Sequence, residues 1–365
     1  MQSVSVAGSP TGAGRRPSSV SFWLGAALAL VAFAAMIVSL ILGGPPLTWV
    51  TGAVYVICAT GWAIISARSR RPYVAFILPA LSFYLVFVVF PTIEAFRFSL
   101  YDWSGFGEPK DFVGLLNFQG VLTSATFYNA FWHNLVLFLS IFVLQNTIGL
   151  LLAVLLNGRP RFFETYRAMI FSPGIISLVA SGLMWQLIFG SNIGLLTPVL
   201  QGLHLDFLVR DWLGDDSITF WLLVLVQFWQ WMGLPMIVFL AGLQNVPEEL
   251  IAAARIDGAN EVQAFRHVTF PLLAPAFTVV TGLSFITMFK VFDIPFVMAG
   301  AGGSPDGTTD MLSLVIYRDA FGLGTTVQTS LQQGYAVAIG VVMFLVILVV
   351  ATLQLIVLRR REVSL

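Results

Sequence analysis

Long runs of apolar residues recur along almost the whole chain and are separated by shorter polar segments. Eight of these runs have about the 20 residues that a helix needs to cross the ~30 Å hydrocarbon core of a bilayer. Hydrocarbon offers the backbone no hydrogen-bond partner, so each run is expected to be a helix. The pattern predicts an all-α integral membrane protein with about eight transmembrane helices, roughly at residues 22–43, 49–66, 74–95, 131–156, 168–190, 219–244, 271–298 and 335–358.

Basic residues are distributed unevenly over the segments between these runs. If residue 1 lies in the cytoplasm, the opposite side holds four of them, namely Arg97, Lys110, Arg210 and Arg318. The cytoplasmic side then holds thirteen: Arg15, Arg16, Arg68, Arg70, Arg71, Arg159, Arg161, Arg167, Arg255, Arg266, Arg359, Arg360 and Arg361. Cytoplasmic loops of membrane proteins carry such an excess of Lys and Arg. The distribution therefore predicts a multi-pass protein of the cytoplasmic membrane with both termini in the cytoplasm.

The composition agrees with a chain that faces lipid. Hydrophobic residues make up 58% of the sequence and charged residues only 10%, whereas a soluble domain carries about 25% charged residues. No basic patch rises above short loop clusters, so nucleic acid is not an expected partner. The first apolar run follows a polar tail, residues 1–21. It is longer than the roughly 7–15 residues of a signal-peptide core, so we expect it to remain as a membrane helix.

A polar stretch, PEELIAAARIDGANEVQAFRHVTFPLLAP, occupies residues 247–275 between the sixth and seventh runs. Glu248 and Glu249 suit the positive end of a first short helix, and Gly258 suits the left-handed residue that ends it. Asn260 and Gln263 match a capping box that begins a second helix. A helix that only rests on the membrane should carry basic residues above bulky apolar ones, so docking into a groove of another protein is favoured.

This stretch resembles a known motif. The pattern PEEL-x-x-AA-x-x-DGA…F…PLL-x-P is similar to the EAA loop of permease subunits of bacterial ABC importers. Three further segments resemble parts of sugar-type permeases in the same order. They are FVGLLNFQGVL (112–122), TYRAMIFSPGIISLVASGLMWQLIF (165–189) and FKVFDIPFVMAGAGGSPDGTTDML (289–312). The resemblance is closest to the maltose and glycerol-3-phosphate type and covers the chain from about residue 74 onward.

The resemblance implies a domain organisation and a set of partners. Residues 73–365 would form the six-helix permease core, with the coupling loop at 245–270, and residues 22–72 would form two extra N-terminal helices. The expected partners are a second homologous permease subunit, two copies of a cytoplasmic ABC ATPase, an extracytoplasmic solute-binding protein and membrane lipid. The expected location is the bacterial cytoplasmic (inner) membrane.

In that family the loop forms a coupling helix that fits into a cleft of the ATPase. The resemblance implies this role for Glu248, Glu249, Ala253, Ala254, Asp257, Gly258, Ala259 and Phe265. Ala252 departs from the pattern, because the family usually has the Glu of the EAA motif at this position. One charged contact with the ATPase is therefore in doubt.

The chain lacks the residues for ATP hydrolysis. A P-loop needs Gly-Lys-Ser/Thr, but Lys110 precedes Asp111 and Lys290 precedes Val291. The three histidines show no metal-ligand spacing. We expect a non-enzymatic chain without a cofactor, and we expect the partner ATPase to bind ATP and magnesium.

Polar residues inside a membrane are costly and often mark a pathway. The sixth run contains Gln227, Trp229, Gln230 and Gly233. Amide groups bind sugar hydroxyls and an aromatic face covers sugar C–H groups, so these residues are candidates for a substrate pathway. Packing with interhelical glutamine bonds explains Trp229 and Gln230 equally well and is favoured for Gln227. Gln145 and Asn146 in the fourth run are similarly ambiguous.

The seventh run contains a second candidate group, Phe289, Lys290 and Asp293. Lys290 and Asp293 are three residues apart and would lie on one face of a helix. A structural ion pair between them is favoured over a lining role in the pathway.

These observations indicate the permease subunit of an ATP-driven, binding-protein-dependent importer of a sugar or sugar-like solute. The absence of a basic cluster favours a neutral saccharide over a phosphorylated substrate. An ion-coupled secondary transporter should show repeated halves and a buried ionisable site. A non-transporting scaffold would leave the polar residues of the sixth run and the 245–270 loop without a purpose.

Overall fold

The computed structural model describes Leu81 and residues 83–107, 109, 111–158, 160–190, 194–323 and 333–359, together with isolated residues Ala32, Tyr55, Thr60 and Gly61. The tail 1–21 and the predicted helices within 22–72 therefore lie outside the described residues, apart from those isolated positions. The chain divides into two compact units, Met1–Glu94 and Ala95–Leu365. The second unit contains the elements described below, from the end of α4 onward.

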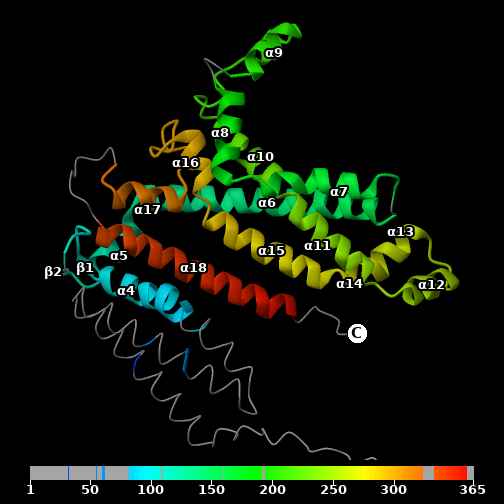
Figure 1. The fold of residues 1–365 in the computed structure, drawn as a ribbon, viewed down its shortest axis with the longest axis horizontal. Helices are drawn as coiled ribbons and strands as arrows, with labels where there is room; N and C mark the ends of the chain where they lie inside the picture. Colours follow the sequence, from blue (N-terminus) through cyan, green and yellow to red (C-terminus); the bar gives the residue numbers. More distant parts are fainter. Residues whose placement is uncertain are drawn as a thin grey trace, which may run out of the picture. The chain divides into compact units, whose positions relative to one another are not determined.

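The described residues are mostly helical (Figure 1). A two-stranded antiparallel sheet, β1 (Tyr101–Asp102) and β2 (Asp111–Phe112), pairs Tyr101 with Phe112. The helices are η1 (Leu85–Val89), α4 (Phe90–Phe98), α5 (Leu116–Thr123), α6 (Ala125–Asn157), α7 (Phe163–Phe171), η2 (Ser172–Ile175), α8 (Leu178–Phe189), α9 (Leu196–Gly202), η3 (Asp206–Leu208), α10 (Thr219–Trp231), α11 (Gly233–Gln244), α12 (Glu248–Ile256), α13 (Glu261–Ala264), η4 (Phe265–Thr269), α14 (Phe270–Leu272), α15 (Ala274–Phe289), α16 (Asp293–Ala299), α17 (Leu312–Ala320) and α18 (Gln333–Arg359).

Two of the predicted runs are continuous helices that are long and apolar enough to cross a membrane. Helix α6 contains the run predicted at 131–156, and α18 contains the run predicted at 335–358. Helix α6 begins several residues earlier than predicted, because the Ser124 side chain caps it by accepting a hydrogen bond from the Phe127 N–H group. Such caps satisfy one of the N–H groups that a helix start leaves free.

Three other predicted runs are bent. The angle is 95° between α7–η2 and α8, 45° between α10 and α11, and 59° between α13–α14 and α15. Proline lies beside each bend: Pro173 in η2, Pro235 in α11 and Pro271 in α14. Proline lacks the backbone N–H group and its ring clashes with the preceding turn, which kinks or ends a helix. These three runs are therefore interrupted helices, and the described residues contain two to five helical spans, depending on whether a bent pair counts as one.

Helix α6 occupies the centre of this unit and packs against α10, α11, α15 and α17 (Figure 1). Three apolar clusters fill the spaces around it. The first surrounds Leu223 and Ile294, the second surrounds Phe285 and Phe289, and the third surrounds Phe239. Burial of these side chains holds the bent helices against the straight one.

Two of the bends lie directly against each other. Gly233, the first residue of α11, approaches the end of α7 so closely that an added Cβ atom would lie 2.7 Å from the Cα atom of Phe171. The Gln230 side chain, one turn earlier, donates hydrogen bonds to the carbonyls of Pro173 (2.7 Å) and Ile176 (2.9 Å). These carbonyls flank the break before α8, where regular helix bonds are interrupted. Gln230 and Gly233 thus join the bend of one span to the bend of the next.

Replacing Gly233 by alanine tests this close approach. The new methyl group would meet backbone rather than a flexible side chain, so we expect Gly233→Ala to lower the free energy of unfolding by about 1–3 kcal/mol. The matched control is Gly202→Ala, since no heavy atom lies within 4 Å of the added Cβ position there. The measurement is the thermal unfolding midpoint of each variant in detergent. Equal midpoints for the two variants would contradict the proposed contact.

Candidate functional site

A cavity of about 160 Å³ lies between four helices, α6, α10, α11 and α15. Its wall is mostly apolar and consists of Gln145, Trp231, Leu234, Pro235, Val238, Val280, Leu283, Ser284, Thr287 and Met288. Leu234 and Pro235 directly follow the bend between α10 and α11. The bend therefore contributes to the wall on that side, while straight α6 contributes Gln145.

The cavity wall contains a few polar groups. The Ser284 hydroxyl donates a hydrogen bond of 2.7 Å to Oε1 of Gln145, which is 3% exposed. The amide nitrogen of Gln145, the hydroxyl of Thr287 and the indole N–H of Trp231 have no hydrogen-bond partner among the described residues. Ligand sites typically combine an apolar lining with a few polar groups that fix orientation. The arrangement is suited to an uncharged ligand with hydroxyl groups.

The four candidate residues of the sixth run lie beside this cavity and are absent from its wall. Gln227 is buried, and its Oε1 atom has no partner among the described residues. Trp229 packs edge-to-face on Trp185, with ring centroids 5.5 Å apart. Gln230 uses both amide hydrogens in the bonds to the break before α8, and Gly233 forms the bend. For Gln230 this geometry matches the alternative of interhelical bonding.

The structure contradicts the predicted ion pair between Lys290 and Asp293. Helix α15 ends at Phe289, and α16 begins at Asp293. The two charged residues therefore do not share a helix, and no ion pair within 4.0 Å joins them. Asp293 instead lies in the first turn of α16, where a carboxylate stabilises the helix. Phe289 is 1% exposed and belongs to an apolar cluster.

Sequence analysis did not single out most of the polar cavity residues. Ser284 and Thr287 are three residues apart on α15, so both can face the same side of that helix. Small hydroxyl residues are common in apolar helices because they bond to their own backbone, which gives them no distinguishing signal. Gln145 stood out as an intramembrane polar residue, but only the fold brings it to the same cavity as Trp231.

The 245–270 loop has the local structure that its sequence predicts. Helix α12 begins after Pro247, with Glu248 and Glu249 in its first turn. Gly258 follows it with φ +90°, a conformation that suits glycine. Asn260 and Gln263 exchange the two 2.9 Å bonds of a capping box that begins α13.

The turn between α12 and α13 is further held by an ion pair. Arg255 Nη2 lies 2.9 Å from a carboxylate oxygen of Glu261, and both side chains are largely exposed. Ala253, Asp257 and Gly258 are exposed, Ala254 and Ala259 are partly buried, and Phe265 packs against the third apolar cluster.

Two large apolar side chains project from this polar loop. Ile256 is 86% exposed and Val262 is 74% exposed. Both side chains are therefore available for contact with another protein. Neither Ile256 nor Val262 belongs to the quoted motif, and neither was predicted to take part in docking.

Comparisons with known proteins agree with these features. The chain is 34% identical over 294 residues to the probable ABC transporter permease protein YurN of Bacillus subtilis, covering 80% of this chain and 97% of YurN. It is 33% identical over 292 residues to the probable starch degradation products transport system permease protein AmyD of Thermoanaerobacterium thermosulfurigenes, covering 80% and 95%. It is 35% identical over 299 residues to the arabinooligosaccharides transport system permease protein AraP of Bacillus subtilis, covering 81% and 91%.

The fold is similar to a chain in the crystal structure of a bacterial ABC transporter involved in alginate import. The TM-score is 0.65 at 21% identity, covering 79% of this chain and 95% of the other. Residues 5–363 match the sequence family described as binding-protein-dependent transport system inner membrane component. The resemblance found in the sequence is thereby confirmed, and the chain is a non-catalytic membrane component. It belongs to the family of inner membrane components of binding-protein-dependent transport systems.

Proposed function

We propose that this permease subunit carries a neutral saccharide through the cavity between α6, α10, α11 and α15. The single observation that carries the proposal is the cavity wall, which combines an aromatic ring with hydrogen-bond donors that have no partner among the described residues. Aromatic faces cover sugar C–H groups, and amide and hydroxyl groups bind sugar hydroxyls. The wall holds no charged side chain, which disfavours a phosphorylated or anionic substrate.

Several relatives support a saccharide as the substrate class. AmyD and AraP are named for the transport of starch degradation products and arabinooligosaccharides. A further relative, from Thermococcus litoralis, is named the trehalose/maltose transport system permease protein MalF and is 33% identical over 273 residues. These relatives differ in the sugar, and the proposal for this chain is limited to the class.

The cavity volume suggests that this chain forms half of the pathway. Ligand sites usually measure about 300–1,000 Å³, whereas this cavity has about 160 Å³. A second, homologous permease subunit would supply the other half. Gln227, Trp229, Phe289, Lys290 and Asp293 remain proposed pathway residues. Gln227 and Phe289 are buried within this chain, so only the other three would make direct contacts in that assembly.

We further propose that α12 and the following turn dock onto a cytoplasmic ATPase that binds and hydrolyses ATP. The exposed Ile256 and Val262 would enter an apolar groove, and Glu248 and Glu249 would lie near its rim. We propose accordingly that the loop and both chain termini lie in the cytoplasm, as the distribution of basic residues predicts. Ala252 is exposed on α12, so the glutamate contact common in the family would be absent here.

The loop is continuous with the cavity wall on both sides. Helix α11, which contains Leu234, Pro235 and Val238 of the wall, is followed by α12 after only residues 245–247. Helices α13 and α14 lead through the 59° bend into α15, which contains Ser284 and Thr287. A displacement of the docked loop can therefore reach both of these cavity walls through packed helices.

Thr287→Val tests the cavity, because valine has nearly the same shape and lacks only the hydroxyl. One hydrogen bond contributes about 0.5–1.5 kcal/mol, so uptake should fall roughly 2- to 12-fold. The control is Thr278→Val on the same helix, since the Thr278 hydroxyl bonds to the Ala274 carbonyl within α15. The assay measures ATP-dependent uptake of labelled maltose, trehalose, arabinose oligosaccharides and starch fragments into proteoliposomes that contain the assembled importer. No uptake of any of these by the wild type would contradict the proposed substrate class.

Gly258→Val tests the docking loop. A β-branched residue with positive φ costs about 1–3 kcal/mol, and we expect ATPase binding to weaken by roughly 5- to 160-fold. Gly107→Val is the matched control, because Gly107 also has positive φ (+70°) and open space around its Cβ position but lies outside the loop. The readout is the amount of ATPase that copurifies with each variant. Equal retention of the ATPase by both variants would show that the loop is not its docking site.

A further inference from the structure

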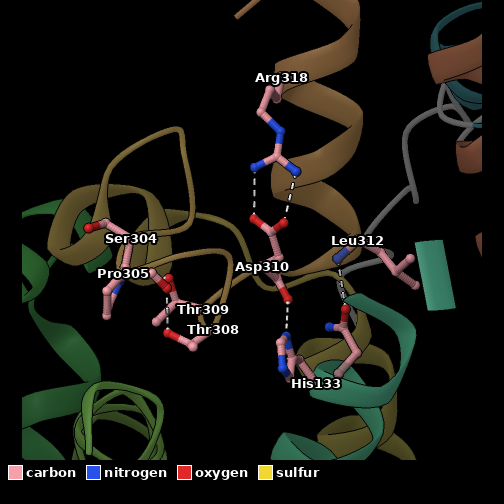
Figure 2. A network of polar contacts seen from close by, with 9 residues as sticks. His133, Ser304, Pro305, Thr308, Thr309, Asp310, Leu312 and Arg318 are labelled. Carbon is pink, nitrogen blue, oxygen red and sulfur yellow. Dashed lines mark hydrogen bonds and ion pairs between the residues drawn. The ribbon is translucent and has the colours of Figure 1, made fainter. Parts of the chain in front are cut away.

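Two neighbouring residues of α6 lie where the segment that connects α16 to α17 meets the helix ends: His133 bonds to this segment, and Asn134 bonds to Leu312, the residue directly after it. This segment, residues 300–311, is called the 300–311 loop below. The His133 Nδ1 atom lies 3.0 Å from the carbonyl oxygen of Asp310 (Figure 2). A carbonyl only accepts hydrogen bonds, so Nδ1 carries the proton and donates it.

Asn134 uses both ends of its side-chain amide. Its Nδ2 atom donates a 2.8 Å hydrogen bond to the Met288 carbonyl, and its Oδ1 atom accepts a 2.8 Å bond from the Leu312 N–H group. The Asn134 side chain is 0% exposed. Met288 lies in the last turn of α15, and Leu312 is the first residue of α17. These are backbone groups that helix ends leave without a partner, so one amide joins α6, α15 and α17.

The 300–311 loop is internally braced where it meets these bonds. Asp310 receives two 2.8 Å hydrogen bonds from the guanidinium group of Arg318, and both residues are buried. A bidentate Arg–carboxylate pair of this kind fixes geometry as well as charge. Thr308 and Thr309 donate their hydroxyl hydrogens to the carbonyls of Pro305 and Ser304 (Figure 2). The loop is therefore suited to transmit a displacement rather than absorb it.

Asn134 is connected to the cavity through its hydrogen bond to the Met288 carbonyl. Met288 is part of the cavity wall, together with Ser284 and Thr287 on the same helix. On the loop side, Ser304 and Asp306 are exposed. The chain of contacts from the exposed loop to the cavity thus runs through Asp310, Leu312 and Asn134 to the Met288 carbonyl.

We propose that Asn134 is a positioning residue of transport that connects the 300–311 loop to the cavity wall. This inference rests on the proposed function. The 300–311 loop lies at the opposite end of α6 and α15 from α12 and α13 (Figure 1). With α12 on the cytoplasmic side, the loop faces the side from which the solute-binding protein approaches. Contact of the loaded binding protein with the loop would then move the end of α15 and change the cavity.

The test uses the assembled importer in proteoliposomes and two variants that break the connection differently. Asn134→Leu removes both hydrogen bonds. Asn134→Asp keeps the acceptor for Leu312 but, when ionised, loses the donor to Met288. In both variants we expect basal ATP hydrolysis to persist. Uptake per ATP hydrolysed, and the stimulation of hydrolysis by loaded binding protein, should fall roughly 5- to 150-fold, the usual range of coupling between sites.

Asn146→Leu is the matched control. Asn146 is a buried asparagine on the same helix, but within the described part of the chain its amide nitrogen bonds only to the Phe142 carbonyl of α6 (2.7 Å). We expect this variant to keep the wild-type ratio of uptake to hydrolysis. If Asn134 had only a structural role, its substitution would reduce the amount of assembled complex. The ratio of uptake to ATP hydrolysis in each remaining complex would then be unchanged.

Two results would overturn the inference. Either both Asn134 variants keep the wild-type ratio of uptake to ATP hydrolysis, or Asn146→Leu lowers that ratio as much as they do. A wrong proposed function would give a different result, since the wild-type complex would then take up none of the labelled saccharides. In that case the stimulation of ATP hydrolysis by the binding protein still separates the Asn134 variants from Asn146→Leu.

Discussion

Breaks in apolar helices leave backbone carbonyl and N–H groups away from water, and this constraint governs the described part of the chain. Buried side-chain amides provide partners at two of the breaks. Gln230 donates to the carbonyls of Pro173 and Ile176, and Asn134 bonds to the Met288 carbonyl and the Leu312 N–H group. Each amide also joins helices that are distant in the sequence. The residues that satisfy the backbone groups at these breaks therefore also connect separate helices.

The same breaks make room for the cavity and connect it to the rest of the unit. Helices α10 and α11 bend by 45° just before Leu234 and Pro235, which line the cavity. Helix α15 leaves the 59° bend, contributes Ser284 and Thr287, and ends at Phe289. Helix α6 stays straight and contacts all of these elements. One straight helix and several bent ones thus surround the cavity, an arrangement that would suit the proposed pathway.

Sequence patterns predicted the features that depend on neighbouring residues. The positions of α6 and α18, the capping box of Asn260 and Gln263, and the glycine turn at Gly258 all follow from local composition. The 95° bend before α8 and the end of α15 at Phe289 did not follow from local composition, because the hydropathy of a chain does not show where a helix ends. The ion pair expected between Lys290 and Asp293 was wrong for that reason. The bonds of Gln230 reach across more than 50 residues, and only tertiary packing determines such partners.

Labelling the cavity itself tests most directly whether it is the substrate pathway. The chain has a single cysteine, Cys58, so a Cys58→Ser, Thr287→Cys variant carries one thiol at the cavity wall. The measurement is the rate of thiol modification in the assembled importer during ATP-driven uptake, with and without the transported saccharide. Slower modification in the presence of saccharide is the expected result. An unchanged rate, under conditions where the same complex imports the saccharide, would show that the substrate passes elsewhere.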